Sequence, residues 1–562
     1  MSGAWIGYDL PTSPASYHEL CDGFEWERPE TYNIADVALG GDPDAIALRH
    51  VPEPGRPAAD GVSGDEIDSI RTLTYGALAD ATATVATRLR EAGIGPDDRV
   101  AVCLPQCPEL VVLHLAVLRL GGVVVPVSML LGDESFAHVL EHSDTRALFV
   151  DEQRWNRSDS DPLEAPDLTV PVRIDEGRDA LGGLAGFVSD TSAPAEPPMA
   201  RTAPEDPALV LYTSGTTSDP KGVIQSHQYL LGSMPGYHCW FELFDPERTR
   251  QSRVWTPSEW AWAGALFDVV FPTLAVGGTV VSSVRRAGFD AANALERLCT
   301  QAVTHAFLPP TALRQIRRHT DPSASDVTSL RVVMCGGESL PPSVAEWAES
   351  TLDVTVNESY GQTEANALVG ESDCVYSGSP DALGRPYPGH EIVLLGDDGQ
   401  PVSDGEIGEI TVTLPDPVVM RGYLDDKRAT DAVLDNERLR TGDLGRFKAN
   451  DVLEHLGRKD DLILSSGYRI SPLEIENALM DHPDVAAVLV EGESDEERGQ
   501  RAVATVVPAT DVSDEDTLSR SLRSHVAERL GPHKRPRRIE FVSRLSTTRT
   551  DKTDRSENAG DP

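Results

Sequence analysis

The sequence predicts an α/β protein, and two observations support this prediction. Helix-like segments alternate with short apolar strands between Thr72 and Val150, and the same alternation resumes at Ala208 and continues to about Pro386. The length of 562 residues exceeds what one compact core holds, so about three or four packing units are expected. Strands that alternate with helices are typical of a largely parallel sheet with helices on its faces.

The elements of the first part of the chain can be placed in order. The expected helices and strands are Tyr75 to Ala92, Val100 to Leu104, Leu110 to Leu120, Val123 to Val127 and Ala147 to Val150. The apolar run that starts at Leu110 is interrupted by charged residues, glycines and a proline. It therefore predicts a buried helix, a turn and a strand rather than a membrane span.

Later segments have a different character. Between Trp155 and Pro207 the chain is rich in Asp, Pro, Ala and Gly, which indicates an irregular segment or a surface insertion. Glu391 to Leu414 predicts short antiparallel strands, and Glu474 to Val542 predicts a second set of helices and strands. The residues after Lys552 are polar and are expected to fray.

The charge balance is strongly acidic. Lys and Arg number 49 against 91 Asp and Glu, which gives a net charge of −42. Such a field repels nucleic-acid phosphates and anionic lipid headgroups, so neither partner class is expected. The chain has few lysines, and most of its cations are Arg. This balance indicates a halophilic protein from a high-salt cytoplasm, and an acidic protein of ordinary habitat is the alternative.

Cysteine usage and the N-terminus indicate a cytoplasmic protein. The seven cysteines include no CxxC pair, and an odd number cannot form a complete disulfide framework. The first ten residues lack a basic region leading into an apolar core, so no secretory signal is expected. We therefore expect a reducing compartment and no insertion into a membrane.

The strongest local motif is the run LYTSGTTSDPKGV from Leu211 to Val223. Backbone N–H groups and hydroxyls around a glycine converge on phosphate oxygens, and a lysine adds positive charge. The Walker spacing GxxxxGK[ST] is absent. An ordinary solvated turn is the alternative. The candidate phosphate-binding residues are Thr213, Ser214, Gly215, Thr216, Thr217 and Lys221.

This run resembles the phosphate loop YTSGTTGxPKG of the adenylate-forming superfamily, which includes the acyl-CoA synthetases. Ser218 stands where the family usually has glycine, so a positive φ would be strained there. The resemblance extends from about Tyr32 to Arg555. It implies a large N-terminal domain of βα subdomains with a small β-barrel-like subdomain, residues 1–459. It also implies a small mobile α+β lid, residues 460–562, with its hinge at Asp460.

Two later segments, Cys335 to Leu340 and Tyr360 to Glu364, follow expected strands in the order that the family has. Either alone would equally be an ordinary βα turn. In the family they surround the adenine and the α-phosphate, with a glutamate at the place of Glu364 holding Mg²⁺. A carboxylate suits a hard cation, and the hydroxyl of Thr363 can bond the α-phosphate as charge builds there. The candidate ATP-binding residues are Gly337, Glu338, Ser339, Glu358, Ser359, Tyr360, Gly361 and Gln362.

The resemblance places further contacts nearer the C-terminus. An Asp can accept two ribose hydroxyls and an Arg can support the same sugar, so Asp443 and Arg458 are the expected ribose residues. A following glycine-bearing loop implies pantetheine contacts of CoA near Ser466 and Gly467, with Arg469 reaching the phosphates. Turn residues and a plain surface loop are the alternatives.

The last motif resembles LPKTxSGKxxR and makes Lys552 the candidate catalytic lysine. Lys552 and Arg555 keep their places, whereas Ser546, Thr547 and Asp551 replace the proline, a lysine and the glycine of the family. An adjacent Asp favours protonated lysine, which is the form that the chemistry requires. A solvated charged tail is the alternative.

An aromatic segment from Trp255 to Trp262 resembles the pocket wall of short- and medium-chain acyl-CoA synthetases. Such a row is more often core, and only Trp260 is placed at the substrate. Acetate-specific synthetases carry tryptophan at the position of Gly361, so glycine there implies room for a medium-chain or branched acid. His227 either faces this site or lines a helix.

These matches predict an AMP-forming acyl-CoA synthetase, an acid–thiol ligase that makes acyl-CoA, AMP and pyrophosphate from a carboxylic acid, ATP and CoA. An acyl-adenylate is the expected intermediate, with Lys552, Thr363 and Glu364 as catalytic residues and ATP, Mg²⁺ and CoA as cofactors or co-substrates. An adenylate-only or non-catalytic relative stays open, as does a phosphotransferase or simple ATPase. A homo-oligomer is compatible with all of these readings.

Overall fold

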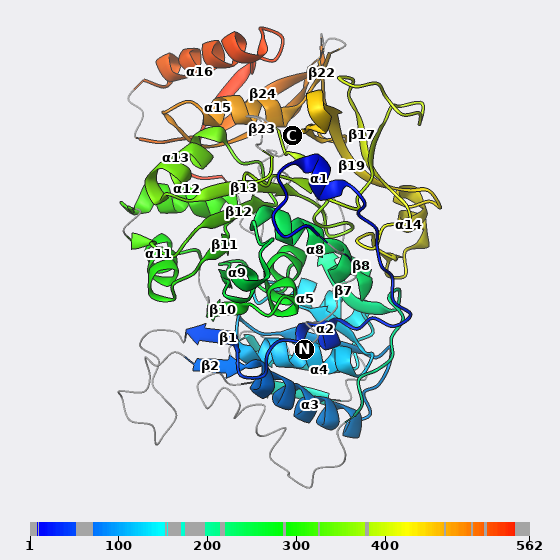
Figure 1. Cartoon of the computed structure of the whole chain (residues 1–562). Helices are drawn as coiled ribbons and strands as arrows, with labels where there is room; N and C mark the ends of the chain where they lie inside the picture. Colours follow the sequence, from blue (N-terminus) through cyan, green and yellow to red (C-terminus); the bar gives the residue numbers. More distant parts are fainter. Residues whose placement is uncertain are drawn as a thin grey trace.

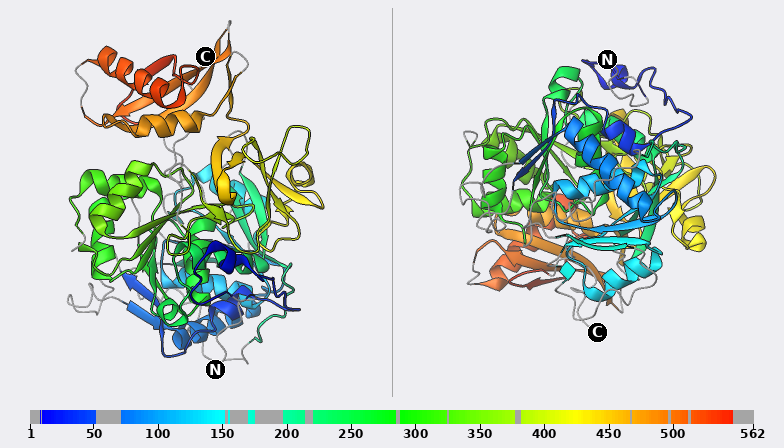
Figure 2. Two further views of the ribbon diagram at one scale, coloured as in Figure 1. Left: turned by 45° about the horizontal axis from the view of Figure 1, so that its top comes forward. Right: turned by 90° about the horizontal axis from the view of Figure 1, so that it is seen from below.

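The computed structural model describes residues 8, 10–51, 71–151, 154–155, 170–174, 197–213, 220–284, 288–323, 326–376, 382–465, 468–495, 498–510 and 514–545. Two large sheets with their helices form the body of the molecule, and the C-terminal unit stands above them (Figure 1). Figure 2 shows this unit set apart from the body in a turned view. The α/β class predicted from the sequence is confirmed.

The first large sheet has seven strands in the order β18-β8-β7-β4-β3-β5-β6. Its five strands from β7 to β6 in that order are parallel, whereas β8 and β18 are antiparallel to their neighbours. The strands are β3 (Arg99–Cys103), β4 (Val123–Pro126), β5 (Ala147–Asp151), β6 (Val170–Ile174), β7 (Pro207–Thr213), β8 (Lys221–Ser226) and β18 (Gly422–Tyr423).

The second large sheet has nine strands in the order β15-β14-β13-β12-β11-β9-β10-β1-β2. The six strands from β13 to β1 are parallel, and the strands at both ends are antiparallel. The strands are β1 (Ile46–Val51), β2 (Arg71–Thr74), β9 (Arg253–Trp255), β10 (Thr279–Ser283), β11 (His305–Phe307), β12 (Val332–Gly336), β13 (Thr355–Tyr360), β14 (Val369–Gly370) and β15 (Arg385–Pro386).

Buried helices join the sheets into one main core. α4 (Pro108–Arg119) begins with proline at its first turn, which suits a helix start, and all of its residues but Arg119 are buried. α3 (Tyr75–Glu91) is capped by the Thr74 hydroxyl, which accepts from the Ala77 N–H. The other helices of the body are α1 (Tyr17–Cys21), α2 (Ile34–Ala38), α5 (Asp133–His142), α8 (Gln228–Trp240), α9 (Pro246–Arg250), η3 (Ala265–Val270), α10 (Phe271–Ala275), α11 (Ala291–Thr300), α12 (Pro310–His319) and α13 (Pro342–Leu352).

A small antiparallel sheet follows, as the segment after Glu391 predicts. Its order is β16-β17-β19-β20, formed by β16 (Ile392–Leu395), β17 (Gly408–Thr413), β19 (Arg438–Phe447) and β20 (Leu453–Arg458), with α14 (Lys427–Val433) beside it. Alternating burial along β19 places one face of this sheet against the main core.

The C-terminal unit has its own core, built around Ile463, Ile475, Val490 and Leu522. In it, α15 (Pro472–Met480) and α16 (Glu515–Leu530) pack on each other, and α15 packs on strand β23. The strands are β21 (Ile463–Ser465), β22 (Tyr468–Ile470), β23 (Val485–Asp495), β24 (Gly499–Pro508) and β25 (Arg538–Phe541).

Three details differ from the sequence expectations. β6 lies within the stretch expected to be irregular, where it pairs with β5 in parallel. α5 was not among the expected helices, although its buried residues Phe136, Val139 and Leu140 have the i, i+3, i+4 spacing of a helix face. β7 and β8 form a hairpin rather than a βα unit. No helix of the described residues is long and apolar enough to cross a membrane, and all seven cysteines are free.

Candidate functional site

Three of the predicted segments meet at one buried carboxylate, Asp443 on β19, which is 4% exposed. The Tyr360 hydroxyl and the Gln362 side-chain amide each donate to its Oδ2 at 2.6 Å. Arg458, at the end of β20, places its guanidinium 3.3 Å from Oδ1. Residues separated by about 80 positions in sequence thereby form one polar cluster.

The electrostatics of Asp443 favour its ionised form. Burial alone raises the pKa of a carboxyl, but hydrogen bonding and charge from His455, together with the charge of Arg458, lower the pKa of Asp443 below its ordinary value. An ionised carboxylate that is held at this place is a strong acceptor for hydroxyl groups.

A second cluster lies around Glu364. Tyr423 on β18 donates its hydroxyl to Glu364 Oε1 at 2.8 Å. The same tyrosine carries the Lys221 ammonium 5.1 Å from its ring centroid, a cation–π contact. The lysine of the phosphate-loop motif and the predicted metal-binding carboxylate are therefore linked by one side chain.

Tyr423 did not emerge from the sequence. It lies 59 residues from Glu364, and it reaches the site because β18 pairs with β8, with Tyr423 opposite Val223. Its only local signal is a Gly-Tyr pair before a helix, which is too common to indicate a site.

The hairpin of β7 and β8 holds the two ends of the phosphate-loop motif. Thr213 and Lys221 are opposite each other in its register. Ser214, Gly215, Thr216 and Thr217 lie outside the described residues, as do the predicted CoA residues Ser466 and Gly467 and the predicted catalytic Lys552.

Thr363 is fixed through its backbone. Its carbonyl oxygen accepts from the Tyr229 hydroxyl at 3.1 Å and from the side-chain amide of Gln225. Gln225 belongs to β8 and Tyr229 to α8, so the segment that carries Thr363 and Glu364 is tied to the hairpin that carries the phosphate loop.

The expected purine loop follows β12, where Gly337 has a φ of +82° that residues with a side chain rarely adopt. Glu338 accepts from the Thr311 hydroxyl at 2.7 Å and pairs with Arg314 at 3.1 Å, both on α12. The Ser339 hydroxyl donates to the Asn477 side-chain carbonyl at 3.0 Å, and Asn477 belongs to α15 of the C-terminal unit.

Glu358 and Ser359 lie within β13. Ser359 pairs with Gly336 and Gly370 on the neighbouring strands, so it is a framework residue of the sheet. The Glu358 carboxylate accepts from the Leu340 N–H at 3.1 Å. Burial and the charge of nearby Glu371 raise the pKa of Glu358 to about 8. The Glu358 carboxyl therefore helps to fix the backbone of the purine loop at Leu340.

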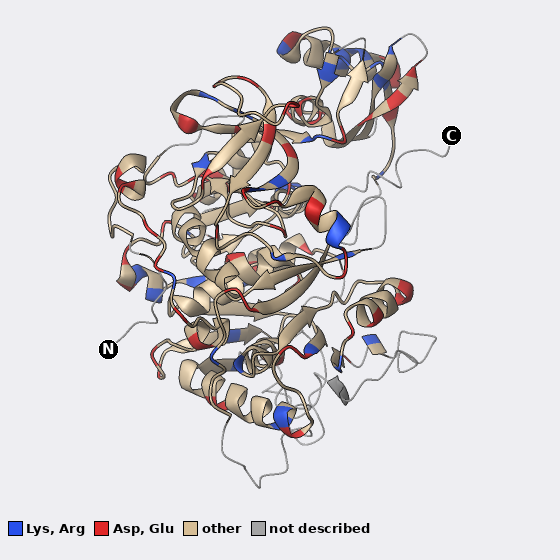
Figure 3. Ribbon diagram, turned by 90° about the vertical axis from the view of Figure 1, so that its right-hand side faces the viewer, with Lys and Arg blue, Asp and Glu red and all other residues tan. Residues whose placement is uncertain are grey.

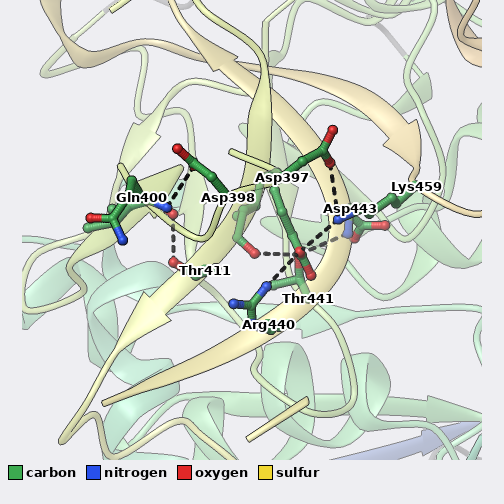
Figure 4. Close-up of polar contacts among 11 residues, drawn as sticks. Asp397, Asp398, Gln400, Thr411, Arg440, Thr441, Asp443 and Lys459 are labelled. Carbon is green, nitrogen blue, oxygen red and sulfur yellow. Dashed lines mark hydrogen bonds and ion pairs between the residues drawn. The ribbon is translucent and has the colours of Figure 1, made fainter. Parts of the chain in front are cut away.

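Lys459 is engaged in ion pairs beside Asp443 (Figure 4), and Arg469 also pairs with an acidic residue of this region. Arg469 lies 2.7 Å from Asp397, and Lys459 lies 3.3 Å from Glu409 and 3.8 Å from Asp397. The pair of Arg469 with Asp397 joins the C-terminal unit to the small antiparallel sheet. In this arrangement Arg469 is not free for phosphates. Asp460 follows in an exposed turn between β20 and β21.

The acyl-pocket expectation changes in one respect. Trp260 is 1% exposed and fits a wall. A Cβ at Gly361 would lie 2.6 Å from the Ala367 N and 2.9 Å from the Asn366 carbonyl carbon. The place of a side chain at Gly361 is thus filled by the chain's own backbone. Glycine is required there by this close approach, and the inference that it leaves room for acyl groups is not supported.

Asp268 is a further residue of this region that the sequence did not single out for a role. It lies on the fully buried π-helix η3, where Asn366, two residues after Glu364, donates its side-chain amide to Asp268 Oδ1. Burial raises the pKa of Asp268 to about 7. The signal in the sequence is an acid within the otherwise apolar run from Ala265 to Val270.

His227 is a buried framework residue. Its Nδ1 accepts from the Ile34 N–H at 3.2 Å, and burial lowers its pKa to about 3. Of the two readings of this histidine, the structure therefore supports the one in which it lines a helix.

A metal ion fits the site through Glu364 alone. Mg²⁺ is commonly held by one or two carboxylates together with substrate phosphates, and Glu364 supplies one next to the phosphate-loop hairpin. Among the described residues no group of three His, Cys, Asp or Glu side chains could hold a metal ion. The residues present fit a cation that arrives with a nucleotide.

Comparison with known proteins agrees with this geometry. A family model described as AMP-binding enzyme matches residues 46–424, and one described as AMP-binding enzyme C-terminal domain matches residues 474–552. The chain is 30% identical to the mitochondrial acyl-coenzyme A synthetase ACSM4 of Rattus norvegicus, over 96% of this chain and 92% of that protein.

Two other relatives are named for different activities. A feruloyl-CoA synthase of Amycolatopsis sp is 32% identical over 85% of this chain and 91% of its own length. The solved structure of the amide bond synthetase McbA from Marinactinospora thermotolerans is 28% identical, with a TM-score of 0.76, over 93% of this chain and 98% of that one.

Proposed function

The chain belongs to the AMP-binding enzyme family, and on this premise we propose that it catalyses ATP-dependent acyl-CoA synthesis. The reaction converts a carboxylic acid, ATP and CoA into acyl-CoA, AMP and pyrophosphate. The observation that carries the proposal is the meeting of Tyr360, Gln362, Asp443 and Arg458 beside the linked Lys221, Tyr423 and Glu364.

The nucleotide is proposed to lie across the two clusters. Asp443 accepts the ribose hydroxyls, and Arg458 supports the same sugar. Purine contacts come from the segment Gly337 to Ser339 and from Glu358 to Gln362. The phosphates are proposed to lie between Thr363 and the hairpin strands that carry Thr213 and Lys221, where the Lys221 ammonium supplies positive charge.

In the first proposed step the substrate carboxylate attacks the α-phosphorus of ATP, and pyrophosphate leaves. Mg²⁺ held at Glu364 supplies neutralisation of phosphate charge. Thr363 donates its hydroxyl toward the α-phosphate, and Lys552 places its ammonium between the reacting groups. Ionised Asp443 keeps the nucleoside in position while these groups act.

In the second proposed step the C-terminal unit, residues 460–562, rotates about Asp460 relative to residues 1–459. Its separate core, which contains Ile463, Ile475 and Leu522, supports movement as one body. Rotation exchanges Lys552 for the loop that contains Ser466 and Gly467, so that the CoA thiolate attacks the acyl carbonyl and AMP leaves. Arg469 must then exchange Asp397 for phosphate.

For the acid we propose a medium-chain or branched substrate. Trp260 and the buried face of η3 provide an apolar wall for such a chain. The support for this choice comes from the wall and not from Gly361, whose side-chain space is filled.

A second candidate function is adenylate formation without thioester formation. Two observations favour it: the motif around Lys552 departs from the family pattern at Ser546, Thr547 and Asp551, and the chain is 28% identical to an amide bond synthetase. The two candidates share the first step and differ in the nucleophile that receives the acyl group.

The test is a panel of carboxylic acids with ATP, Mg²⁺ and CoA, in which AMP, pyrophosphate and thioester are quantified together. Acid-dependent AMP and pyrophosphate with thioester support the proposed ligase. Acyl-AMP that accumulates without thioester supports the second candidate. Release of ADP or phosphate would overturn both, because it indicates a phosphotransferase or ATPase.

We further propose that the enzyme works in a high-salt cytoplasm. Asp and Glu are distributed over both the body and the C-terminal unit (Figure 3), in keeping with a net charge of −42. Salt screens the mutual repulsion of such charges. Running the acid panel from low to molar KCl tests this, because an enzyme of ordinary habitat loses activity as salt rises.

A further inference from the structure

A cavity of about 360 Å³ lies at the N-terminal ends of the parallel strands of the nine-stranded sheet. Five arginines line it: Arg49, Arg248, Arg250, Arg253 and Arg331. Arg253 opens β9, and Arg331 directly precedes β12. In a chain with 49 basic and 91 acidic residues, five guanidiniums around one small cavity are a notable concentration of positive charge.

These arginines are not neutralised within the part of the chain that the structure describes. No ion pair there joins any of the five to a carboxylate. Arg49 donates its Nε to the neutral Gln301 side chain at 2.8 Å, and the Nε of Arg253 is buried without a hydrogen-bond partner. A buried donor of this kind costs free energy unless a ligand or water satisfies it.

The acids nearest in sequence are committed elsewhere. Asp245 caps α9 by accepting from the N–H groups of Glu247 and Arg248 at 3.0 and 2.8 Å. Glu247 is exposed and accepts from the side chain of Gln251 at 3.4 Å. The positive charge of the five guanidiniums is therefore available to bind an anion that is not part of the chain.

The arginines stand on a rigid frame. The Arg253 N–H donates to the Thr304 hydroxyl at 2.8 Å, and the Arg331 N–H donates to the Thr304 carbonyl at 2.9 Å. The strands that follow are paired in parallel, β9 with β11 and β11 with β12. The backbone positions of the guanidiniums are therefore set by the sheet, which lowers the cost of ordering them around a ligand.

The cavity is separate from the nucleotide site, because parallel strands carry the two at opposite ends. β12 starts beside Arg331 and ends at Gly336, directly before the purine loop. In Figure 1, α9 and β10 lie near the middle of the body, below α12 and α13 and away from the C-terminal unit at the top. An anion in this cavity contacts none of the residues proposed for ATP.

We propose that this cavity binds a small polyanion, a molecule with two or more phosphate or carboxylate groups. Guanidinium forks bind both groups through paired N–H donors, and five of them exceed what one monovalent anion can occupy. A volume of about 360 Å³ falls in the range of small-molecule sites. Phosphate and carboxylate ligands share this chemistry, so the probes must distinguish them.

The test is isothermal titration calorimetry of the whole chain with inorganic tripolyphosphate and, separately, with citrate. Mg²⁺ is left out, and ionic strength is fixed at a value where the protein is folded. We expect saturable binding at one site, weakened at least tenfold by the double change Arg253→Gln and Arg331→Gln. The tighter probe identifies phosphate or carboxylate as the preferred group.

Two control variants locate the binding. Arg317→Gln removes an exposed guanidinium of α12 that bonds the Ser343 carbonyl away from this cavity, and it should leave the Kd unchanged. Lys221→Gln alters the nucleotide side and should also leave it unchanged. The proposal is overturned if neither probe binds saturably, if the double variant keeps the wild-type Kd, or if the loss follows Lys221→Gln. Unchanged acid-dependent AMP release by the double variant shows that it is folded.

Discussion

The cations at the two ends of the parallel strands differ in whether they have carboxylate partners within the chain. At the nucleotide end three cations are paired with carboxylates of the chain, Arg458 with Asp443, Arg469 with Asp397, and Lys459 with Glu409, while Lys221 lies over the Tyr423 ring. At the opposite end Arg253, Arg331 and their neighbours have no carboxylate partner among the described residues. The paired cations fix the positions of neighbouring segments, and the proposed domain rotation must break some of these pairs. The arginines without carboxylate partners are instead proposed to bind an anion from solution.

The largest expected effect concerns the cation that the lid brings to the nucleotide end. Lys552→Ala should lower the rate of acid-dependent pyrophosphate release about 100- to 1000-fold, because the proposed mechanism places no other side-chain cation between the reacting groups. Thioester formation from supplied acyl-AMP should change much less. Equal loss in both half-reactions would remove Lys552 from its assigned step.

The next effect tests whether pairing at Asp443 matters to the site. Asp443→Asn keeps the size of the side chain but removes the charge that faces Arg458, so the KM for ATP should rise about 10- to 100-fold. Arg250→Gln, in the cavity at the other end, should leave the KM for ATP within about twofold. A similar change in both variants would erase the distinction between the two ends.

The buried side chain of Asp268 should make the stability of the folded protein depend on pH. Asp268 has an ordinary pKa of 3.8 and a folded-state pKa of about 7, so the folded protein keeps a proton that the unfolded chain releases. Its contribution therefore lowers stability as pH rises from about 4 to 7, by at most about 1.4 kcal/mol per pH unit.

Asp268→Asn should remove this part of the slope in denaturant unfolding measured across that window. Glu358 and Glu371, whose pKa values are also raised by burial, contribute equally to both proteins and cancel in the difference. Parallel stability curves for the two proteins would contradict the assignment to Asp268.

The smallest effect belongs to the exposed pairs of the C-terminal unit. Asp397→Ala releases Arg469 and leaves Lys459 paired with Glu409, and exposed pairs are each worth about 0–1 kcal/mol. The ratio of thioester formation to pyrophosphate release should shift about two- to fivefold, with little change in melting temperature. Asp398→Ala, which removes only a contact to the Gln400 N–H, is the matched control.

Local patterns in the sequence predicted much of the fold. α3 and α4 follow from helix-like runs with clear starts, and the short strands β3, β4 and β5 follow from short apolar segments before and after α4. β6 was missed because a short strand that pairs with β5 in parallel has no local signal beyond Val-Pro-Val. The order of the motifs identified the family, since several segments match together.

Contacts between distant segments could not be predicted in the same way. The bond from Tyr423 to Glu364 and the cluster of five arginines depend on strand order, which no local spacing encodes. At Gly361 the residue was identified but its physical reason was not, because the approach of Asn366 and Ala367 is a property of the folded chain. A carboxyl on a π-helix, Asp268, was likewise hidden within an apolar run.

The pairing of β18 with β8 has a consequence for biosynthesis. Until Gly422 and Tyr423 have left the ribosome, the backbone groups of Val223 and Ile224 have no strand beside them on that side. While the roughly 200 residues that follow β8 are being synthesised, the nascent chain would expose this sheet edge next to the phosphate loop. Exposed sheet edges can pair with other chains. The last short strand of the sheet therefore covers this edge only late in synthesis, and fragments that end before it should be poorly soluble.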